Sequence, residues 1–300
     1  MVMSLRWTAL SASVQGASHE HRGQGNQDAV RLNNPSGLDD TVILAIADGH
    51  GSARSFRSAR GSAMAAECAL HELRRFIRQL GPDAPLSRVR YQAKNRWPKA
   101  VITAWKSAVR ADLAAHPFTQ MEFAAFPEPP PVVKPGKELP ITAYLAYGAT
   151  LITVAITRHF ILYSQLGDGD ILTVQPNGVV SRPLPKRHEF QANQTVSLCS
   201  HHAWNEFQIR VDALRGPTPA LIMLSTDGYA NCFGRDEDFF KVGGDFLTYL
   251  RHEGSAFVQG KLESWLRQSS HDGSGDDITV GLAVRANAFP FSAGNGANSI

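Results

Sequence analysis

Three aspartates stand at the ends of apolar runs in this sequence and could together hold a metal ion. Asp48 and Asp227 each close such a run, and Asp276, with Asp277 beside it, opens another. Runs that are aliphatic or β-branched at nearly every position are typical of buried strands. If the strands lie close together, their carboxylates converge, and converging carboxylates need a hard cation to offset their repulsion. The pattern therefore favours a metal-assisted hydrolase.

The residues that follow Asp48 strengthen this interpretation. Gly49 lets the backbone approach a cation closely, so that its carbonyl oxygen can be a ligand. His50 is close enough to the same cation to exchange protons near neutral pH. A lone Asp-Gly pair is more often an ordinary turn. The Gly-His-Gly extension and the preceding buried strand favour the metal site instead.

The other acidic candidates are weaker when taken singly. A strand-end turn explains Asp227 about as well as a site does, and a tight hairpin turn does the same for Asp168. Neighbouring residues of a strand point to opposite faces, so we expect Asp276 to be a ligand and Asp277 to support it. Asp28 follows a Gly-rich loop and opens a strand, which alone is a weak signal.

Composition limits the class of protein and its partners. The 300 residues carry a formal net charge of +3, which is too small to argue for a nucleic-acid partner. No stretch approaches the roughly 20 apolar residues of a membrane-spanning helix, and the N-terminus lacks a signal-peptide pattern. Three cysteines lie far apart and form no Cys-x-x-Cys pair. This favours reduced thiols, and we expect a cytoplasmic protein with no membrane partner.

The elements that must position these residues can be predicted from periodicity. A long helix is expected from an N-cap at Ser52 to a stop at Gly81-Pro82, a second from near Pro98, and two more at 245–252 and 256–267. Strands are expected at 5–15, 29–33, 41–47, 147–157, 160–166, 171–175, 179–182, 195–198, 207–211, 220–226 and 278–285. Long runs of consecutive strands argue against alternating βαβ units. We therefore expect an α+β fold, a four-layer α-β-β-α sandwich of two antiparallel sheets flanked by helix pairs.

One domain is expected over residues 1–285. The stretch 126–140 contains six prolines and no periodicity, which predicts a surface loop of extended character. The tail 286–300 is rich in Gly, Asn and Ala and is expected to be flexible.

Six short motifs follow one another along nearly the whole chain. They are Asn26-Gln27-Asp28, Ala47-Asp48-Gly49-His50-Gly51, Gly148-Ala149-Thr150, Leu166-Gly167-Asp168, Leu224-Ser225-Thr226-Asp227-Gly228 and Asp276-Asp277-Ile278-Thr279-Val280. Any one is weak, but six in this order are highly specific. The set resembles the metal-dependent, type 2C serine/threonine protein phosphatases. The run Gly16-Ala17-Ser18-His19, followed by Gln27-Asp28, is similar to a bacterial branch of that family.

The resemblance implies a β-sandwich flanked by helices, with Mg²⁺ or Mn²⁺ at one end. Asp48 would bridge two metals, and the Gly49 carbonyl would bind the second. Asp227 and Asp276 would complete the first metal, and Asp168 would bind a weaker third.

The resemblance also assigns catalytic roles. Asp28 matches an acid that acts mainly through metal-bound waters, and His50 matches the proposed proton donor to the leaving alcohol. A hydroxide bridging two cations about 3.5–4 Å apart would attack the phosphorus in line, without a phosphoenzyme.

The phosphate-binding loop departs from the family pattern. The family's usual arginine position is occupied by Gly23, and Arg22 stands one residue early. Three alternatives stay open: Arg22 shifts into place, His19 contacts the phosphate, or the metals hold it alone. We favour Arg22 slightly, because a guanidinium binds phosphate through two hydrogen bonds. Gln27 replaces an acid common in some members, which removes one charge near the second metal.

The resemblance predicts a protein-serine/threonine phosphatase, a phosphoric monoester hydrolase of bacterial signal transduction. Its expected partner is a phosphorylated protein, a cognate serine/threonine kinase or one of its targets, and we expect a monomer. One alternative is a catalytically weak pseudophosphatase that acts as a signalling binding module. Another is a hydrolase of small phosphoesters.

Overall fold

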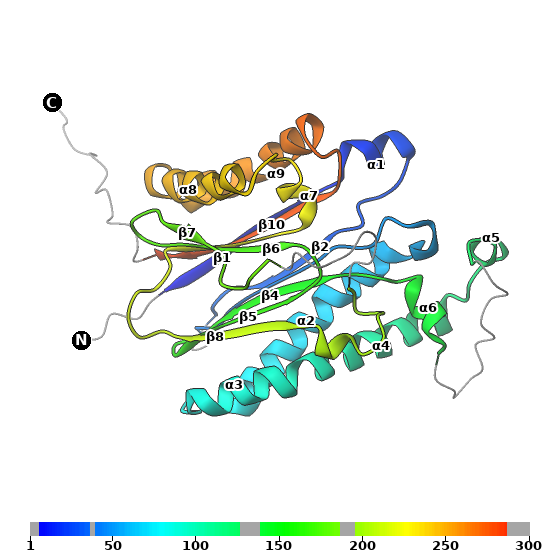
Figure 1. The fold of residues 1–300 in the computed structure, drawn as a ribbon, viewed down its shortest axis with the longest axis horizontal. Coiled ribbons are helices and arrows are strands. Elements are labelled where there is room, and N and C mark those ends of the chain that lie inside the picture. The colour runs from blue at the N-terminus through cyan, green and yellow to red at the C-terminus, as the bar shows by residue number, and fades with distance from the viewer. Residues whose placement is uncertain (1–5, 37–39, 127–138, 187–195, 287–300) are drawn as a thin grey trace.

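Two antiparallel sheets packed face to face form the centre of the molecule, and helices cover their outer faces (Figure 1). The computed structural model describes residues 6–36, 40–126, 139–186 and 196–286. Within this part of the chain each sheet has five strands. The predicted four-layer α-β-β-α sandwich is confirmed.

The first sheet joins the beginning and the end of the described chain. Its strands, in spatial order, are β1 (Trp7–Val14), β10 (Ile278–Arg285), β9 (Leu221–Ser225), β6 (Asp170–Val174) and β7 (Val180–Ser181). β1 pairs with β10 along its whole length, from Trp7 opposite Arg285 to Val14 opposite Ile278. The predicted loop 126–140 and tail 286–300 lie almost entirely outside the described residues.

The second sheet is built from the middle of the chain. Its strands, in spatial order, are β2 (Ala29–Asn33), β3 (Val42–Ala47), β4 (Leu151–Ile156), β5 (Phe160–Leu166) and β8 (Gln208–Ala213). All pairings within it are antiparallel.

Each sheet has its own set of covering helices. The second sheet is covered by α2 (Ser58–Leu80), α3 (Leu86–Asn95) and α4 (Trp97–Ala115), and the first by α8 (Asp236–His252) and α9 (Gly254–Asp272). The short helices are α1 (Ala17–Arg22), α5 (Gln120–Ala124), α6 (Ile141–Leu145) and α7 (Asp227–Ala230). None of the helices in the described ranges is long and apolar enough to cross a membrane.

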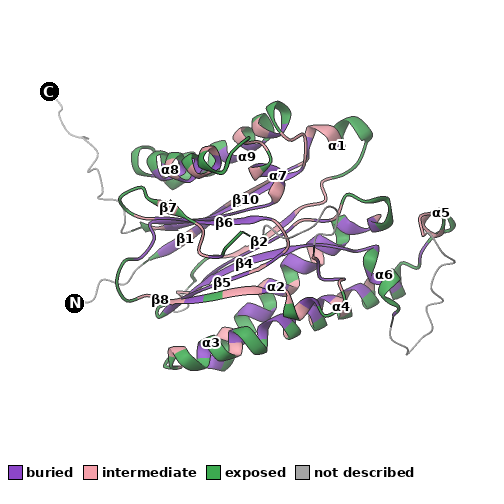
Figure 2. Cartoon of the chain, in the orientation of Figure 1, coloured by how far each residue is buried: buried purple, intermediate pink, exposed green. Residues whose placement is uncertain are grey.

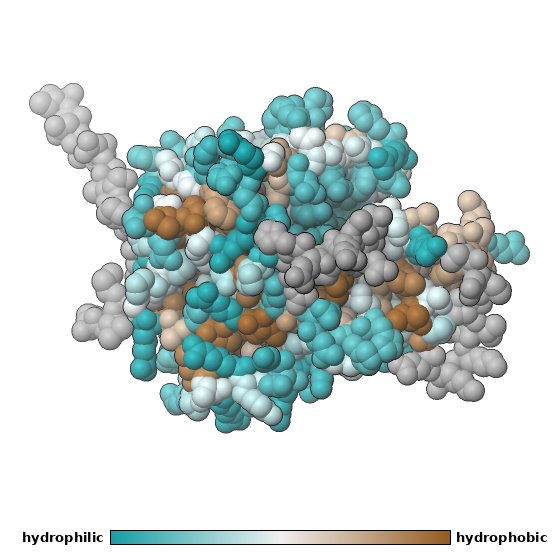
Figure 3. Space-filling view, viewed as in Figure 1, coloured by the Kyte–Doolittle hydropathy of each residue, from teal (hydrophilic) through white to brown (hydrophobic). Residues whose placement is uncertain are grey.

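The strands of the sandwich are largely buried (Figure 2). Strand β3 is buried on both faces, because one face meets helices and the other meets the opposite sheet. Ile43 and Ala45 belong to the core beneath α2 and α4. Leu44 and Ile46 belong to the core between the sheets, together with Ile222. This two-sided burial explains why the run is apolar at every position rather than alternating. Outside these cores the visible surface is largely hydrophilic, with separate apolar groups (Figure 3).

Local pattern mispredicted several elements. Residues 17–22 were expected to lie in a loop, yet they form α1. Residues 196–198, the described part of the strand expected at 195–198, form no strand. Strand β4 begins at Leu151 instead of 147. Ser52 precedes a short 3₁₀ turn, and the long helix begins at Ser58. Helix α1 is held by tertiary contacts, because the Ala17 amide donates to Ser270 Oγ and the Ser18 amide to the Gly275 carbonyl.

The link between β5 and β6 is not a hairpin turn. β5 pairs with β4 and β8, whereas β6 pairs with β9 and β7, so the link crosses from one sheet to the other. Gly167 has a φ of 107°, a conformation that favours glycine. The crossing places Asp168 at the seam between the sheets.

Strand register brings the predicted site residues to one end of the sandwich. Asp170 and Val280 both lie opposite Ser225, so β6, β9 and β10 end at about the same level. In the facing sheet, Ala47 at the end of β3 lies opposite Ala29 at the start of β2. The residues just beyond these strand ends therefore gather at the same edge.

Candidate metal centre and active site

A polar pocket of about 330 Å³ lies at this end of the sandwich. Of the residues predicted to form the site, those that line it are Arg22, Asp48, Gly49, His50, Asp168, Asp227 and Asp276. The remaining lining residues are Ser18, His19, Gln27, Gly51, Thr150, Ser274, Gly275 and Asp277. Asp28 does not line the pocket.

Three carboxylates converge in the pocket from three different elements. Asp48 follows β3, Asp168 lies in the β5–β6 link, and Asp227 begins α7. Each offers one oxygen, and these oxygens lie within 4.8 Å of one another. One hard cation with oxygen ligands at about 2.0–2.6 Å can contact all three. Asp276 lies in the same pocket but is not part of this group of three.

The electrostatics of the pocket favour a bound cation. Burial raises the pKa of Asp48 well above the usual range, and the charges of Asp28 and Asp227 raise it further. Burial also raises the pKa of Asp227, with Asp168 and Asp276 adding to the effect. Half-buried acids that repel one another are poorly tolerated as a group unless a positive charge compensates them. The donor set therefore fits a hard divalent cation.

Backbone hydrogen bonds hold Asp48 and the loop after it. The Thr150 amide donates to the Asp48 carbonyl at 2.8 Å, and the Asp48 amide donates to Thr150 Oγ1 at 3.2 Å. The Gly49 amide donates to the Gln27 carbonyl at 3.1 Å. A Cβ at Gly49 would lie 2.7 Å from that carbonyl oxygen and 2.8 Å from the backbone carbonyl oxygen of Ser58, so the loop accepts only glycine here.

His50 is fixed against the turn that precedes β4. Its amide donates to the Gly148 carbonyl at 3.1 Å, and a Cβ on Gly148 would lie 2.5 Å from the imidazole Cδ2. The glycine in the Gly148-Ala149-Thr150 motif therefore makes room for the ring. Burial lowers the pKa of His50, and the charge of Asp168 partly opposes this.

Asp28 lies behind the pocket, against the first sheet. Thr226 Oγ1 donates to Asp28 Oδ2 at 2.8 Å, and the Asp28 amide donates to Asn26 Oδ1 at 2.9 Å. Burial raises the pKa of Asp28 well above the usual range, and hydrogen bonds from the Thr226 and Thr279 side chains oppose the rise. The contact with Thr226 was missed at the sequence level, although the Ser-Thr-Asp-Gly motif contains this residue.

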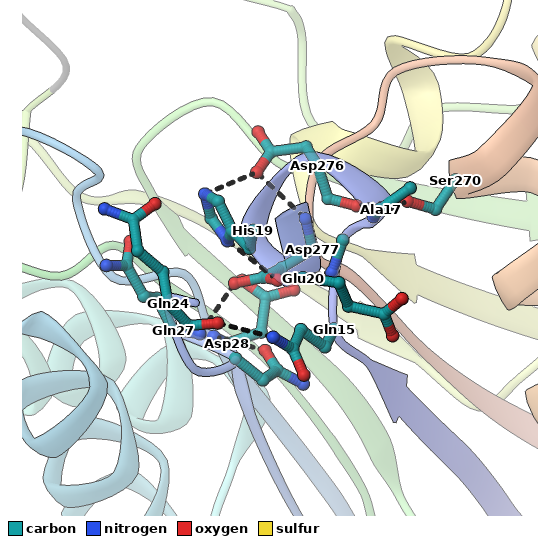
Figure 4. Close-up of polar contacts among 12 residues, drawn as sticks. Gln15, Ala17, His19, Glu20, Gln24, Gln27, Asp28, Ser270, Asp276 and Asp277 are labelled. Atoms are coloured by element: carbon teal, nitrogen blue, oxygen red, sulfur yellow. Dashed lines mark hydrogen bonds and ion pairs between the residues drawn. The ribbon is translucent and has the colours of Figure 1, made fainter. Parts of the chain in front are cut away.

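The side chains of Asp276 and Asp277, which both line the pocket, differ in exposure. The Asp276 side chain is 49% exposed and faces the pocket, whereas that of Asp277 is 4% exposed. The Gly16 amide donates to Asp277 Oδ1 at 2.6 Å. The Gln27 amide donates to Asp277 Oδ2, also at 2.6 Å (Figure 4). Asp277 therefore fastens both ends of the segment 16–27 to the start of β10.

Arg22 is the last residue of α1 and is exposed at the pocket. Among the described residues its side chain makes no hydrogen bond or ion pair, so its guanidinium is available to an anion. Gly23 caps the helix with a φ of 64°, which turns the chain away after Arg22.

The model of the protein phosphatase 2C family matches residues 15–267 of this chain. The chain belongs to the protein phosphatase 2C family. This confirms the predicted enzyme class, a protein-serine/threonine phosphatase. A search of curated proteins found no match.

Solved structures of bacterial phosphatases share the protein phosphatase 2C fold seen here. The catalytic domain of PstP in complex with 2 manganese ions is 18% identical, with a TM-score of 0.55, over 93% of this chain and 98% of that one. PstP/Ppp from Mycobacterium tuberculosis is 16% identical, with a TM-score of 0.54, over 94% and 99%. Stp1 from Staphylococcus aureus is 14% identical, with a TM-score of 0.55, over 95% and 98%. At these identities the comparison confirms the fold.

Proposed function

We propose that this protein phosphatase 2C member removes phosphate from phosphoserine and phosphothreonine in proteins, using Mg²⁺ or Mn²⁺. The supporting observation is the convergence of three carboxylates within 4.8 Å in a pocket that also contains an arginine and a histidine. The proposed ligands of two metals are Asp48, the Gly49 carbonyl, Asp227 and Asp276, with Asp168 at a third, weaker site. The PstP structure, which holds 2 manganese ions, supports the choice of metal.

Bound divalent cations would lower the pKa of a water molecule and neutralise charge on the phosphoryl oxygens. The protein's own groups bind and orient the substrate around them. Arg22, which is unpaired among the described residues, would bind the phosphate through two hydrogen bonds. The His50 imidazole would give a proton to the leaving oxygen of the serine or threonine. Asp28, which lies behind the pocket, would act through ordered water rather than by direct contact.

The proposed partner is a phosphorylated protein, either a cognate serine/threonine kinase or one of that kinase's targets. We further propose one catalytic domain over residues 1–285, acting as a monomer in the cytoplasm. The pairing of β1 with β10 supports a single domain, because it joins both ends of this range in one sheet. The free state of Cys68, Cys199 and Cys232 supports a reducing compartment.

Phosphate release from a phosphopeptide tests the function directly. We expect release in the presence of Mn²⁺, loss of release with a chelator, and loss of release in Asp48→Ala because a central ligand is removed. Asp83→Ala, which changes an exposed aspartate in the α2–α3 loop, is the matched control and should retain activity. Wild-type protein that binds Mn²⁺ but releases no phosphate would instead indicate a binding module. Faster turnover of small phosphoesters than of phosphoproteins would overturn the proposed substrate class.

A further inference from the structure

Positive charge is concentrated on the helices that cover the second sheet. Residues 74–99, from the end of α2 through α3 to the first turn of α4, contain eight lysines and arginines and one acid, Asp83. The full chain has 30 basic and 27 acidic side chains, so the rest of it is net acidic. All eight basic residues are exposed, and we call them the basic surface: Arg74, Arg75, Arg78, Arg88, Arg90, Lys94, Arg96 and Lys99.

Little of this positive charge is neutralised by the chain itself. Within the described residues the one ion pair of the basic surface joins Arg75 Nη1 to Glu72 Oε1, at 3.6 Å. Arg78 donates to a backbone carbonyl of its own helix, and Arg90 donates to the Val211 carbonyl of β8. The side chains of the other five members make no hydrogen bond or ion pair with any described residue. Their charges are therefore available to an anionic partner.

The outer face of α3 adds an exposed aromatic side chain to the basic surface. Val89 and Ala93 are fully buried and form the inner face of this helix. Tyr91 is 66% exposed, and Arg88 and Lys94 lie three residues before and after it on the same side of the helix. Tyrosine and arginine are enriched at protein–protein interfaces and among the residues that contribute most to binding. The outer face of α3 therefore has the composition of a protein interface.

The basic surface lies far from the metal pocket. Helix α2 begins beside the pocket, because the Ser58 carbonyl lies against Gly49. Arg74 follows Ser58 by 16 residues, which corresponds to about 24 Å along the helix axis. The short link 81–85 then leads from the far end of α2 into α3, in the lower layer of Figure 1. A substrate segment that reaches both places must therefore be at least about 7 residues long.

We propose that the basic surface docks an acidic segment of the phosphoprotein substrate while the pocket holds the phosphorylated residue. The inference rests on the proposed function, because it takes a phosphoprotein as the substrate. Docking at a second place raises the effective concentration of the phosphorylated residue at the pocket. A protein segment fits better than a nucleic acid or an anionic membrane, because the net acidic remainder of the chain would repel a polyanion that extends beyond these helices.

Phosphopeptides with an appended tail test the proposal on the full chain with Mn²⁺. Each peptide carries one phosphoserine, a flexible Gly/Ser linker and a tail of about six Glu or about six Gln residues. With a linker of about 20 residues, we expect KM to be about 3- to 30-fold lower for the Glu tail, the effect of about two exposed ion pairs. A linker of about 4 residues spans at most about 14 Å and should remove the difference. Salt at about 1 M should also remove it, because the screening length falls to about 3 Å.

Charge reversal on α3 tests the place of docking. Arg88→Glu/Lys94→Glu should abolish the advantage of the acidic tail and leave KM for the Gln-tailed peptide unchanged. Arg215→Glu/Lys261→Glu reverses two exposed residues outside the basic surface and should retain the advantage, as a control with the same change in net charge. Tyr91→Ala should reduce the advantage in part, because contact area is lost. Circular dichroism shows whether each variant is folded, and Arg88→Gln/Lys94→Gln serves if the reversal variant is not.

Three results would overturn the proposal. Equal KM values for the two tails in wild type would exclude docking, and an advantage that survives in Arg88→Glu/Lys94→Glu would exclude this surface. Binding of RNA or of phosphatidylglycerol vesicles through Arg88 and Lys94, without an advantage for the acidic tail, would exclude a protein partner. Fluorescence anisotropy with the unphosphorylated acidic tail measures docking without catalysis. If wild type binds this tail but hydrolyses neither phosphopeptide, the proposed function fails while docking of an acidic segment is retained.

Discussion

Mutual repulsion among half-buried acids dominates the site at the scale of single residues. The pKa values of Asp28, Asp48 and Asp227 are all raised, in each case chiefly by burial. Each group also feels the charge of at least one neighbouring carboxylate. Removing water strengthens this repulsion, and the same low-dielectric surroundings strengthen the attraction of a cation. The arrangement that destabilises the metal-free pocket is therefore the one that binds metal.

Arg22→Ala tests the phosphate contact. We expect KM for a phosphopeptide to rise by about 10-fold. A hydrogen bond to a charged group contributes about 1.5–3 kcal/mol, and the lower end of this range applies because the Arg22 side chain is exposed. Mn²⁺ affinity should not change, because Arg22 contacts no carboxylate among the described residues. Steady-state kinetics and Mn²⁺ titration measure the two quantities. Arg215→Ala, an exposed arginine in the loop between β8 and β9, is the control, and an unchanged KM in Arg22→Ala would rule out this contact.

At the scale of elements, close packing of α2 against the turn before β4 positions His50. A Cβ on Gly61 would lie 1.9 Å from the Tyr147 carbonyl oxygen, so α2 can approach this turn only through a glycine. The Gly61 carbonyl in turn accepts a hydrogen bond from Trp105 Nε1 on α4 at 3.0 Å. The His50 amide donates a hydrogen bond to the Gly148 carbonyl in the same turn. The packing of α2 against this turn therefore helps to position the active-site loop.

Gly61→Ala should lower the free energy of unfolding by about 1–3 kcal/mol, because the added methyl group meets backbone rather than a movable side chain. Phosphatase activity should fall as well, since the displaced turn carries the partner of His50. Gly260→Ala on α9 is the control, because a Cβ there meets nothing within 4 Å. That change should stabilise the protein by about 0.5–1 kcal/mol through the higher helix propensity of alanine. Urea unfolding measures both, and equal stabilities of the two variants would contradict the packing argument.

At the scale of the whole molecule, the sandwich ends in a cluster of charge that the fold alone does not neutralise. The two sheets pack through an apolar core that includes Leu44, Ile46 and Ile222. The acids lie just beyond that core, where the strands of both sheets end. Metal binding and folding are therefore linked, since a ligand that binds the folded state adds to its stability.

Thermal unfolding across pH tests this linkage. A carboxyl whose folded pKa is raised above 3.8 contributes stability that is fully present below its unfolded pKa and is lost as the pH rises through its folded pKa. Asp48→Asn removes one such group, so its metal-free Tm should exceed that of wild type by a margin that grows as the pH rises above about 4. At neutral pH, Mn²⁺ at about 100 times its Kd should stabilise wild type by about 2.7 kcal/mol. Mn²⁺ should stabilise the Asp48→Asn variant much less. A metal-free wild type that is more stable than metal-free Asp48→Asn at pH 7 would contradict the expected direction of the Tm difference.

The sequence by itself determined the two-sheet architecture and the identity of the acidic residues. Apolar runs such as 42–47 specify buried strands, because a strand that is buried on both faces needs an apolar residue at nearly every consecutive position. The positions of Asp48, Asp227 and Asp276 at the ends of such runs follow from the same local pattern. The six ordered motifs then indicated the family, because they follow one another in the family's order over nearly the whole chain.

Only the tertiary structure decided how the N-terminal segment meets the metal site. Helix α1 depends on contacts with residues more than 250 positions away, such as the hydrogen bond from Gly16 to Asp277. Such contacts leave no periodicity in a short polar stretch, so local pattern predicted a loop. The position of His19 between two carboxylates, and the crossing that brings Asp168 to the seam, depend on sheet pairing for the same reason. Strands and their terminal acids are local properties of the chain, whereas the partners of those acids are set by packing between distant segments.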